Sequence, residues 1–448
     1  MNWIRVSSLA LAIGMTVSVT GAAAQALNEE TDFGLPQFYG RGKNVSVMER
    51  DRPDYQATGL RVGGFTVLPK IEMGLDYTDN LFAVNGNSGS TSPYPFNGPK
   101  TDIGFVVDPS IAIQSNWGRH SLTALANVRE EEFADFPSEN RTAYSAQTYG
   151  RIDVHGDSYL TMGIDGEHDY EDRGSTVTQE QAVTPVPYDT QGAFFRGVYG
   201  EDRLQAELEG DVRNFHYDSV NQLNLNGTQS PIDEALRDFT QGQIGGRVNF
   251  ALTPDEAVFI KTDYSDGDYL YGAVGSPKRN YDEVRVLGGA NFDITALARG
   301  EIGLGYVDRD YALASYHGIK GFAASAKIEY FPTQLLTLTL TGQRLVQDAA
   351  FSTASGYFEN LVTLGADWEV KRNFILSGLV SEEIDQFQGI SRTDDLTDFK
   401  LIGHYFINRN VGLNATFVYS DRTSNGAPLT IGPIYDETRF LISVVLQR

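Results

Sequence analysis

The stretch Leu336-Thr337-Leu338-Thr339-Leu340-Thr341 alternates strictly between leucine and threonine. Successive side chains of a β-strand point to opposite faces, so this segment presents one apolar face and one polar face. The same alternation occurs over residues 204–209, 322–330 and 440–444, the last of these close to the C-terminus. The pattern predicts an all-β fold whose strands have two unlike faces.

Segments of this kind recur along most of the chain. We count eighteen of them, centred on Gly74, Ser110, Ala126, Thr148, Ile164, Arg196, Leu208, Gly246, Thr262, Gly288, Ile302, Ser325, Leu338, Leu364, Leu376, Leu401, Ala415 and Ser443. Eight of the connections are short and rich in turn residues, for example Asn116-Trp117-Gly118-Arg119 and Thr253-Pro254-Asp255. The connections between them are generally longer, as in residues 86–100, 171–188 and 217–236.

This regular exchange of short and long connections decides the predicted architecture. Transmembrane barrels carry short turns on one rim and longer loops on the other. Closure into a barrel also satisfies the backbone groups that an open sheet edge would expose to lipid. We therefore predict a transmembrane antiparallel β-barrel of the outer membrane, with about 18 strands (16–18), over residues 63–448. A β-propeller or β-helix is the alternative, but each needs a repeated local motif, and the sequence shows none.

Composition agrees with strands and excludes several classes of function. The chain has 448 residues, with 46 glycines, 23 tyrosines, 25 phenylalanines and 3 tryptophans, a composition of strands and turns. Its formal charge of −24 argues against a nucleic-acid partner, which would need a basic face. It has no cysteine, which excludes disulfides, thiolate zinc sites and cysteine nucleophiles.

The N-terminus has the order of a secretory signal. Residues 1–5 carry one positive charge, residues 6–19 are apolar, and Ala22-Ala23-Ala24 provides small residues for cleavage. We predict a signal peptide over residues 1–24. Residues 25–62 lack periodicity and are rich in charge, glycine and proline, so we expect an extended periplasmic segment there.

The region after this segment resembles a known family. The stretches carrying the resemblance are RDRPDY (50–55), GLRVGGF (59–65), LP (68–69), EMGLDYTDNLF (72–82) and PSIAIQSNWGRH (109–120). Together they resemble the putative β-barrel porin 2 family of Gram-negative outer membranes. The resemblance implies an outer-membrane barrel in contact with lipid and lipopolysaccharide, often an accessory of exopolysaccharide export. It further implies a polysaccharide cargo and a periplasmic polysaccharide-export component as partner, and it supplies no catalytic residue.

Catalytic and metal-binding patterns are weak. None of the six histidines falls in a helix-spaced metal motif, and no Gly-x-Ser-x-Gly elbow occurs. His168 with Asp169, Glu171 and Asp172 is the best enzyme candidate, although such clusters arise by chance in acidic loops. A calcium site from Asp76, Asp79 and Asn80 is conceivable, but we favour a turn at the end of a strand. We expect no enzyme, cofactor or metal.

The polar faces of the strands are where function is expected. The lumen-facing candidates carry both signs of charge: Glu207, Glu209, Asp211, Arg213, Arg247, Lys261, Arg299, Glu301, Lys327 and Glu329. Residues 382–398 hold six acids against the single base Arg392, and we expect a long acidic loop at a channel mouth there. The mouth candidates are Glu382, Glu383, Asp394 and Asp395. Salt bridges that only stabilise the barrel, and carboxylates that bind divalent cations or keep the surface soluble, are the alternatives.

The sequence therefore predicts a passive conduit for hydrophilic solutes, because a barrel of this width leaves an aqueous channel unless loops plug it. The family resemblance adds exopolysaccharide export as the specific role. A general diffusion porin for small solutes and a plugged structural or adhesion barrel are the other hypotheses.

Overall fold

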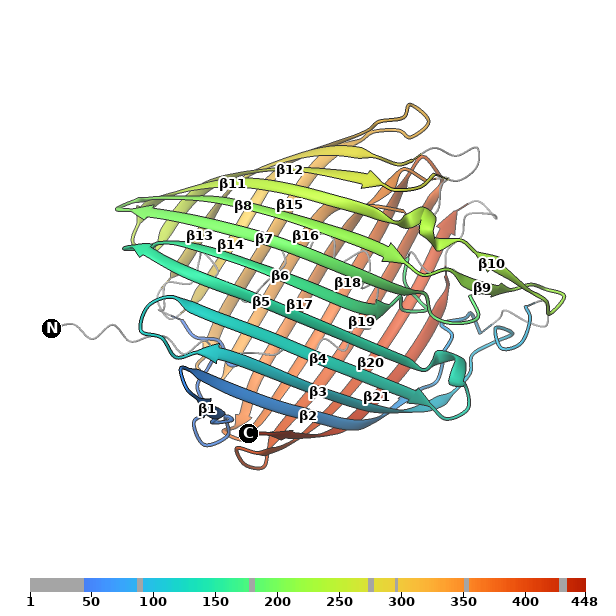
Figure 1. Ribbon diagram of the computed structural model, residues 1–448, viewed down its shortest axis with the longest axis horizontal. Helices are drawn as coiled ribbons and strands as arrows, with labels where there is room; N and C mark the ends of the chain where they lie inside the picture. The colour runs from blue at the N-terminus through green and yellow to red at the C-terminus, as the bar shows by residue number, and fades with distance from the viewer. Residues whose placement is uncertain are drawn as a thin grey trace.

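The computed structural model describes residues 44–86, 92–176, 182–272, 278–294, 297–349, 354–426 and 433–448. Within them the chain forms one closed antiparallel barrel (Figure 1). Each strand pairs with its neighbours in sequence, β8 pairs with β11, and β21 pairs with β2 to close the ring. Strands β2 to β8 and β11 to β21 give seven plus eleven, so eighteen strands make the ring, as the sequence predicted.

The strands of the ring are of similar length. Their bounds are β2 (Phe65–Thr78), β3 (Asp102–Ser115), β4 (Ser121–Phe133), β5 (Arg141–His155), β6 (Ser158–Tyr170), β7 (Pro187–Glu201), β8 (Leu204–Tyr217), β11 (Phe239–Thr253), β12 (Glu256–Tyr269), β13 (Tyr281–Ile294), β14 (Ala298–Tyr311), β15 (Ile319–Thr333), β16 (Leu336–Gln347), β17 (Gly356–Lys371), β18 (Phe374–Gln388), β19 (Arg392–Phe406), β20 (Val411–Gly426) and β21 (Tyr435–Gln447). Every predicted strand centre falls inside one of these strands.

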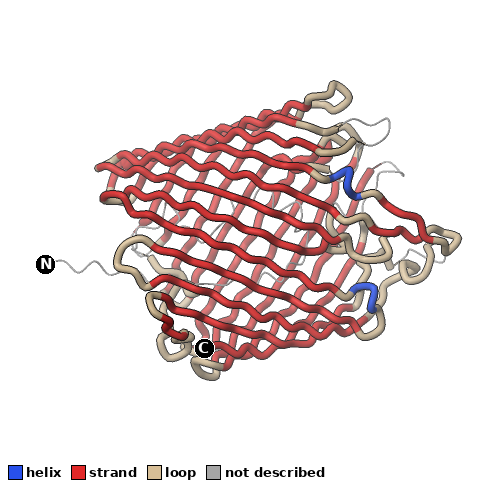
Figure 2. Tube along the Cα trace, viewed as in Figure 1, coloured by secondary structure: helices blue, strands red, loops and turns tan. Residues whose placement is uncertain are grey.

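A few elements lie outside the ring. Strand β1 (Leu60–Val62) pairs with the start of β2, and β9 (Val220–Leu223) pairs with β10 (Gln229–Ile232) in a hairpin that projects from one end (Figure 1). The described helices are two short 3₁₀ turns, η2 (Pro137–Glu139) and η3 (Glu234–Arg237), drawn blue in Figure 2. No helix in the described part of the chain is long and apolar enough to cross a membrane.

The two rims of the barrel differ. One rim, called here the short-turn rim, carries the connections after β3, β5, β7, β11, β13, β15, β17 and β19, along with the C-terminal end of β21. The other, called here the long-loop rim, carries connections as long as residues 79–101 and 218–238 (Figure 2). The β18–β19 connection breaks the pattern because only residues 389–391 join these strands on the long-loop rim.

The two faces of the wall differ as the alternation predicted. Outward residues are apolar and exposed, as with Leu75 at 59% and Ile442 at 67%. Their sequence neighbours point inward and are polar: Glu72, Asp76 and Ser443 are each almost fully buried. Because a lipid-facing wall needs an apolar outer band, this arrangement is that of a membrane barrel.

The prediction of a long acidic loop over residues 382–398 was wrong. These residues form the end of β18 and the start of β19, which pair directly, with Asp385 opposite Asp394. A second acidic run, residues 130–132, likewise lies within a strand, β4, where Glu131 is fully buried. Neighbouring acids in a strand point to opposite faces, so a charge run does not by itself indicate a loop.

Inside the barrel, aromatic side chains pack near the long-loop rim. Phe215, Phe239 and Tyr269, from β8, β11 and β12, stack with ring centroids 4.6 and 5.0 Å apart. Tyr188 and Tyr281 extend this buried cluster. The apolar core of the protein is therefore a layer against the inner wall.

Residues 1–43 lie outside the described residues, and the predicted signal peptide lies among them. Residues 44–56 lie within the short-turn end of the barrel, in contact with inner-face residues such as Thr337 and Glu369.

Candidate functional site

The described start of the connection between β6 and β7, residues 171–176, enters the interior of the barrel. Its residue Thr176 donates a hydrogen bond of 2.5 Å from its hydroxyl to Asp385 on β18. Counting around the ring from β6 through β5, β4, β3, β2, β21, β20 and β19 to β18 gives eight steps of eighteen. The segment Glu171–Thr176, called here the crossing segment, therefore reaches nearly the opposite wall and divides the lumen.

The far end of the crossing segment is held by buried charges. Arg422 of β20 donates to the Thr176 hydroxyl at 2.5 Å and to the Gly174 carbonyl at 3.2 Å. Arg422 also contacts Asp394 of β19 at 2.8 Å, and its side chain is only 1% exposed. Charge-assisted hydrogen bonds are the stronger kind, so this contact is a firm anchor.

The near end is held by two ion pairs with other loops. Arg173 forms a bidentate pair with Glu139 of η2, at 2.8 and 2.5 Å, and its guanidinium lies 5.5 and 5.8 Å from the ring centroids of Phe82 and Phe96. Glu171 accepts two hydrogen bonds from Arg237 of η3. Burial raises the pKa of Glu171, although Arg237 acts to lower it.

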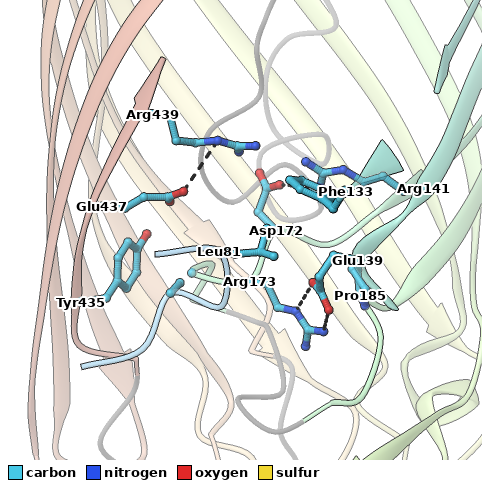
Figure 3. A pocket seen from close by; sticks show the side chains of 12 residues that line it. Leu81, Phe133, Glu139, Arg141, Asp172, Arg173, Pro185, Tyr435, Glu437 and Arg439 are labelled. Atoms are coloured by element: carbon cyan, nitrogen blue, oxygen red, sulfur yellow. Dashed lines mark hydrogen bonds and ion pairs between the residues drawn. The ribbon is translucent and has the colours of Figure 1, made fainter. Parts of the chain in front are cut away.

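Between these anchors, Asp172 contacts a charged network on the wall (Figure 3). Arg141 of β5 donates to Asp172 at 3.3 Å and to Glu131 at 2.6 Å. Arg439 of β21 lies 3.5 Å from Glu131 and donates to Asp76 at 2.6 Å. Acids and bases thus alternate along the network where the loop meets the wall.

Two cavities adjoin this network. One, of about 40 Å³, lies among Asp172, Arg173, Tyr435, Glu437 and Arg439 (Figure 3). The other, of about 150 Å³, is lined by more acids than bases: Asp108, Glu167, Asp169 and Asp172 against Arg129, Arg141 and Arg439. A cavity lined by charges of both signs can orient small polar solutes.

Gly174 allows the crossing segment to approach the wall closely. A Cβ atom at this position would lie 2.2 Å from the Tyr435 hydroxyl on β21. No larger residue fits there unless the loop or the ring moves, so glycine is required by the close contact.

The lumen-facing candidates named from the sequence all lie on the inner face. Most of them join ion pairs between strands, including Arg196 with Glu207, Lys261 with Glu209 at 3.0 Å, and Arg213 with Asp165 at 2.7 Å. Others are Arg247 with Glu301 and Arg299 with Glu329, at 2.5 and 2.6 Å. Asp211 lies 4.0 Å from Arg213, and Lys327 is half-buried opposite Glu301.

The mouth candidates are divided between the two faces. Glu383 and Asp394 point inward, and Asp394 belongs to the anchor of the crossing segment. Glu382 and Asp395 are on the outward face, where Glu382 accepts a hydrogen bond from Thr397. Placing these four acids together at one mouth was therefore incorrect, because two of them face away from the lumen.

The enzyme and calcium candidates are not assembled into sites. His168 points outward, stacked on Tyr144 and bonded to Asp189 at 2.9 Å, whereas Asp169 faces the lumen. Asp76 is paired with Arg439, and Asp79 accepts a hydrogen bond from the Thr438 backbone. Within the described residues, no group of three or more His, Asp or Glu could hold a metal ion.

Comparison with known families agrees with this geometry. Residues 52–448 match the family model described as "Putative beta-barrel porin 2", which covers the whole barrel. The chain belongs to this family. Membership of the putative beta-barrel porin 2 family makes it a porin-like barrel of the outer-membrane type. A comparison with curated proteins finds no match.

Several solved structures are similar to this family member at low sequence identity. The siderophore receptor PirA from Acinetobacter baumannii is 8% identical, with a TM-score of 0.44 over 85% of this chain and 80% of that one. OccK2 (OpdF) from Pseudomonas aeruginosa is 10% identical, with a TM-score of 0.44 over 85% and 98%. The copper transporter OprC is 10% identical, with a TM-score of 0.47 over 87% and 82%.

Sequence reasoning missed the residues that hold the crossing segment. Glu171 and Asp172 were noticed only as a possible catalytic cluster, and Arg422 was not singled out. The local signal was Gly174 beside Arg173 in a long connection. The partners Asp385 and Arg422 are more than 200 residues away in sequence, so only the closed ring brings them into contact.

Proposed function

We propose that this porin-family barrel is an outer-membrane conduit for hydrophilic solutes, narrowed by the crossing segment. The observation that supports it is the partly exposed polar inner face. Polar residues of β15 and β16 point inward and remain only half-buried, so this part of the inner wall is accessible from the lumen: Lys327, Thr339, Thr341 and Gln343. A polar, water-accessible interior within an apolar outer band favours passage of solutes over a solid packed barrel.

The direction of the barrel follows from its rims. In outer-membrane barrels the short turns face the periplasm and the longer loops face outward. The crossing segment would then narrow the outer half of the channel.

The proposal is tested by reconstituting the full-length protein in planar bilayers and in liposomes. We expect discrete conductance steps and osmotic swelling with small sugars. Complete absence of both in correctly folded protein would contradict the conduit and favour the plugged structural or adhesion barrel.

Exopolysaccharide export is the narrower form of this proposal. What supports it is the family resemblance together with a lumen rich in amide, hydroxyl and charged groups, which suit sugars. A strain without the gene should lose surface polysaccharide if the cargo is a glycan. Normal surface polysaccharide with slower uptake of small solutes would instead favour a general diffusion porin.

A further inference from the structure

Residues Asn44–Gln56, called here the N-terminal strap, run along the inner face at the short-turn rim. The strap begins at β13, where Asn44 donates to the Asp293 side chain at 2.7 Å. It ends at β21, where Gln447 donates to the Tyr55 carbonyl at 3.3 Å. The ring order from β13 to β21 covers eight steps of eighteen, so the strap borders nearly half of this opening.

Buried polar contacts seat the strap. The Val47 backbone donates to the Thr337 hydroxyl at 2.9 Å, and Val47 and Thr337 are 0% and 1% exposed. Arg299 of β14 donates to the Asn44 carbonyl at 3.0 Å and pairs with Glu49 at 2.7 Å. These contacts cover inner-wall groups that would otherwise face the channel.

A second set of ion pairs holds the middle of the strap to β17. Arg50 and Arg52 each lie 3.2 Å from the same Glu369 carboxylate oxygen. Arg52 also donates to the Val47 carbonyl at 2.6 Å, which folds the strap into a compact turn. Apart from Val47 and the ring of Tyr55 against Phe406, the contacts that seat the strap are mainly polar.

We propose that the N-terminal strap is a releasable closure of the short-turn opening. It lies outside the strand ladder of the barrel, so its departure breaks no strand pairing. Because the seating contacts are mainly polar, water that enters between the strap and the wall can hydrate the groups that separate, whereas exposing a large apolar contact to water would oppose release. The expectation that release widens a conduit rests on the proposed function. The binding of the strap to the wall and its release do not.

The test measures exposure of the wall beneath the strap. The chain has no cysteine, so Thr337→Cys introduces a single thiol under Val47. Thr341→Cys, two inward positions further along β16, reports on the lumen away from the strap contacts. Each cysteine is placed in the full-length protein, which is folded in detergent and reacted with a water-soluble maleimide.

The strap is loosened by the combined substitutions Glu49→Gln, Arg50→Gln and Arg52→Gln, which remove its ion pairs and leave the barrel strands unchanged. Asp54→Asn, at an exposed position of the same segment, is the matched control. We expect the cysteine of Thr337→Cys to label roughly tenfold faster in the triple variant. This corresponds to a loss of about 1.4 kcal/mol in the free energy that holds the strap against the wall. Labelling at Thr341→Cys should not change, and Asp54→Asn should label like the parent.

Equal labelling of Thr337→Cys in the triple variant and the parent would overturn the proposal. If both cysteines label faster, the single variant Glu49→Gln decides: faster labelling at Thr337→Cys alone supports release, and no change overturns it. Conductance is then measured on the same variants. If the triple variant labels faster at Thr337→Cys but no variant conducts, release of the strap is supported and the proposed conduit is contradicted. The two proposals can therefore fail separately.

Discussion

Gly174 shows how a single hydrogen atom in place of a side chain fixes the path of the crossing segment. Replacing Gly174 with alanine would put a methyl group 2.2 Å from the Tyr435 hydroxyl. We expect the loop to move off β21, with a cost of about 1–3 kcal/mol from overpacking and a larger single-channel conductance. Gly86→Ala is the control, because a Cβ there meets nothing within 4 Å. Unchanged conductance in Gly174→Ala would show that this contact does not limit the passage.

Arg422 and Lys320 contrast a buried charge with an exposed one. Arg422 is 1% exposed and binds Asp394 and Thr176. Asp394 keeps its buried ion pair with Arg392 when Arg422 is lost, so Arg422→Ala removes charge-assisted hydrogen bonds without leaving that carboxylate unpaired and should destabilise the protein by about 1.5–3 kcal/mol. Lys320 pairs with Asp308 and Asp310 but is 46% exposed, so Lys320→Ala should cost less than about 1 kcal/mol. Urea unfolding of both variants in the same detergent gives the comparison. Equal losses of unfolding free energy in the two variants would show that the buried Arg422 contacts contribute no more than the exposed Lys320 pairs.

At the scale of the element, the strap should respond to acid. Burial alone would raise the pKa of Glu49, but hydrogen bonds from Ser46 and the charge of Arg299 outweigh it and lower the pKa below 4.5. Glu329 of β15 also faces Arg299, at 2.6 Å, and shares its charge. A lowered pKa means that the Glu49 contact is fully present above pH 4.5 and is lost as the pH falls through the lowered value.

We therefore expect the conductance to rise when the pH at the short-turn side is lowered from 6 toward 3. Glu49→Gln should show a smaller rise, because its strap contact no longer titrates. A pH response of equal size in Glu49→Gln would place the titrating group elsewhere.

At the scale of the whole molecule, the charge balance predicts ion selectivity. The cavity of about 150 Å³ has four acids against three arginines, and the chain carries a formal charge of −24. We expect cation preference in reversal potentials across a salt gradient, weakening near 1 M salt, where the Debye length is about 3 Å. Glu167→Gln with Asp169→Asn should reduce this preference. The control, Glu382→Gln with Asp395→Asn, should leave the cation preference unchanged, because these two acids face outward. An anion-selective channel would contradict the prediction.

The strands and their two faces can be predicted from the sequence alone. The period of two in Leu336–Thr341 is a local property, since adjacent side chains of a strand point in opposite directions whatever the rest of the chain does. The same rule placed Glu207, Arg247 and Arg299 on the inner face. Counting the alternating segments predicted the number of strands, and the alternating lengths of the connections then indicated a barrel.

The segments that occupy the lumen could not be predicted from local sequence patterns. Thr176 meets Asp385, and Asn44 meets Asp293, across separations of 209 and 249 residues. No periodicity encodes such contacts, because they depend on closure of the ring and on the path of an aperiodic segment through it. Pairing of β18 with β19 also decided that residues 382–398 are mostly strand and not a loop, with Asp385 opposite Asp394. Once these residues are in strands, the local alternation sends Glu383 and Asp394 inward and Glu382 and Asp395 outward.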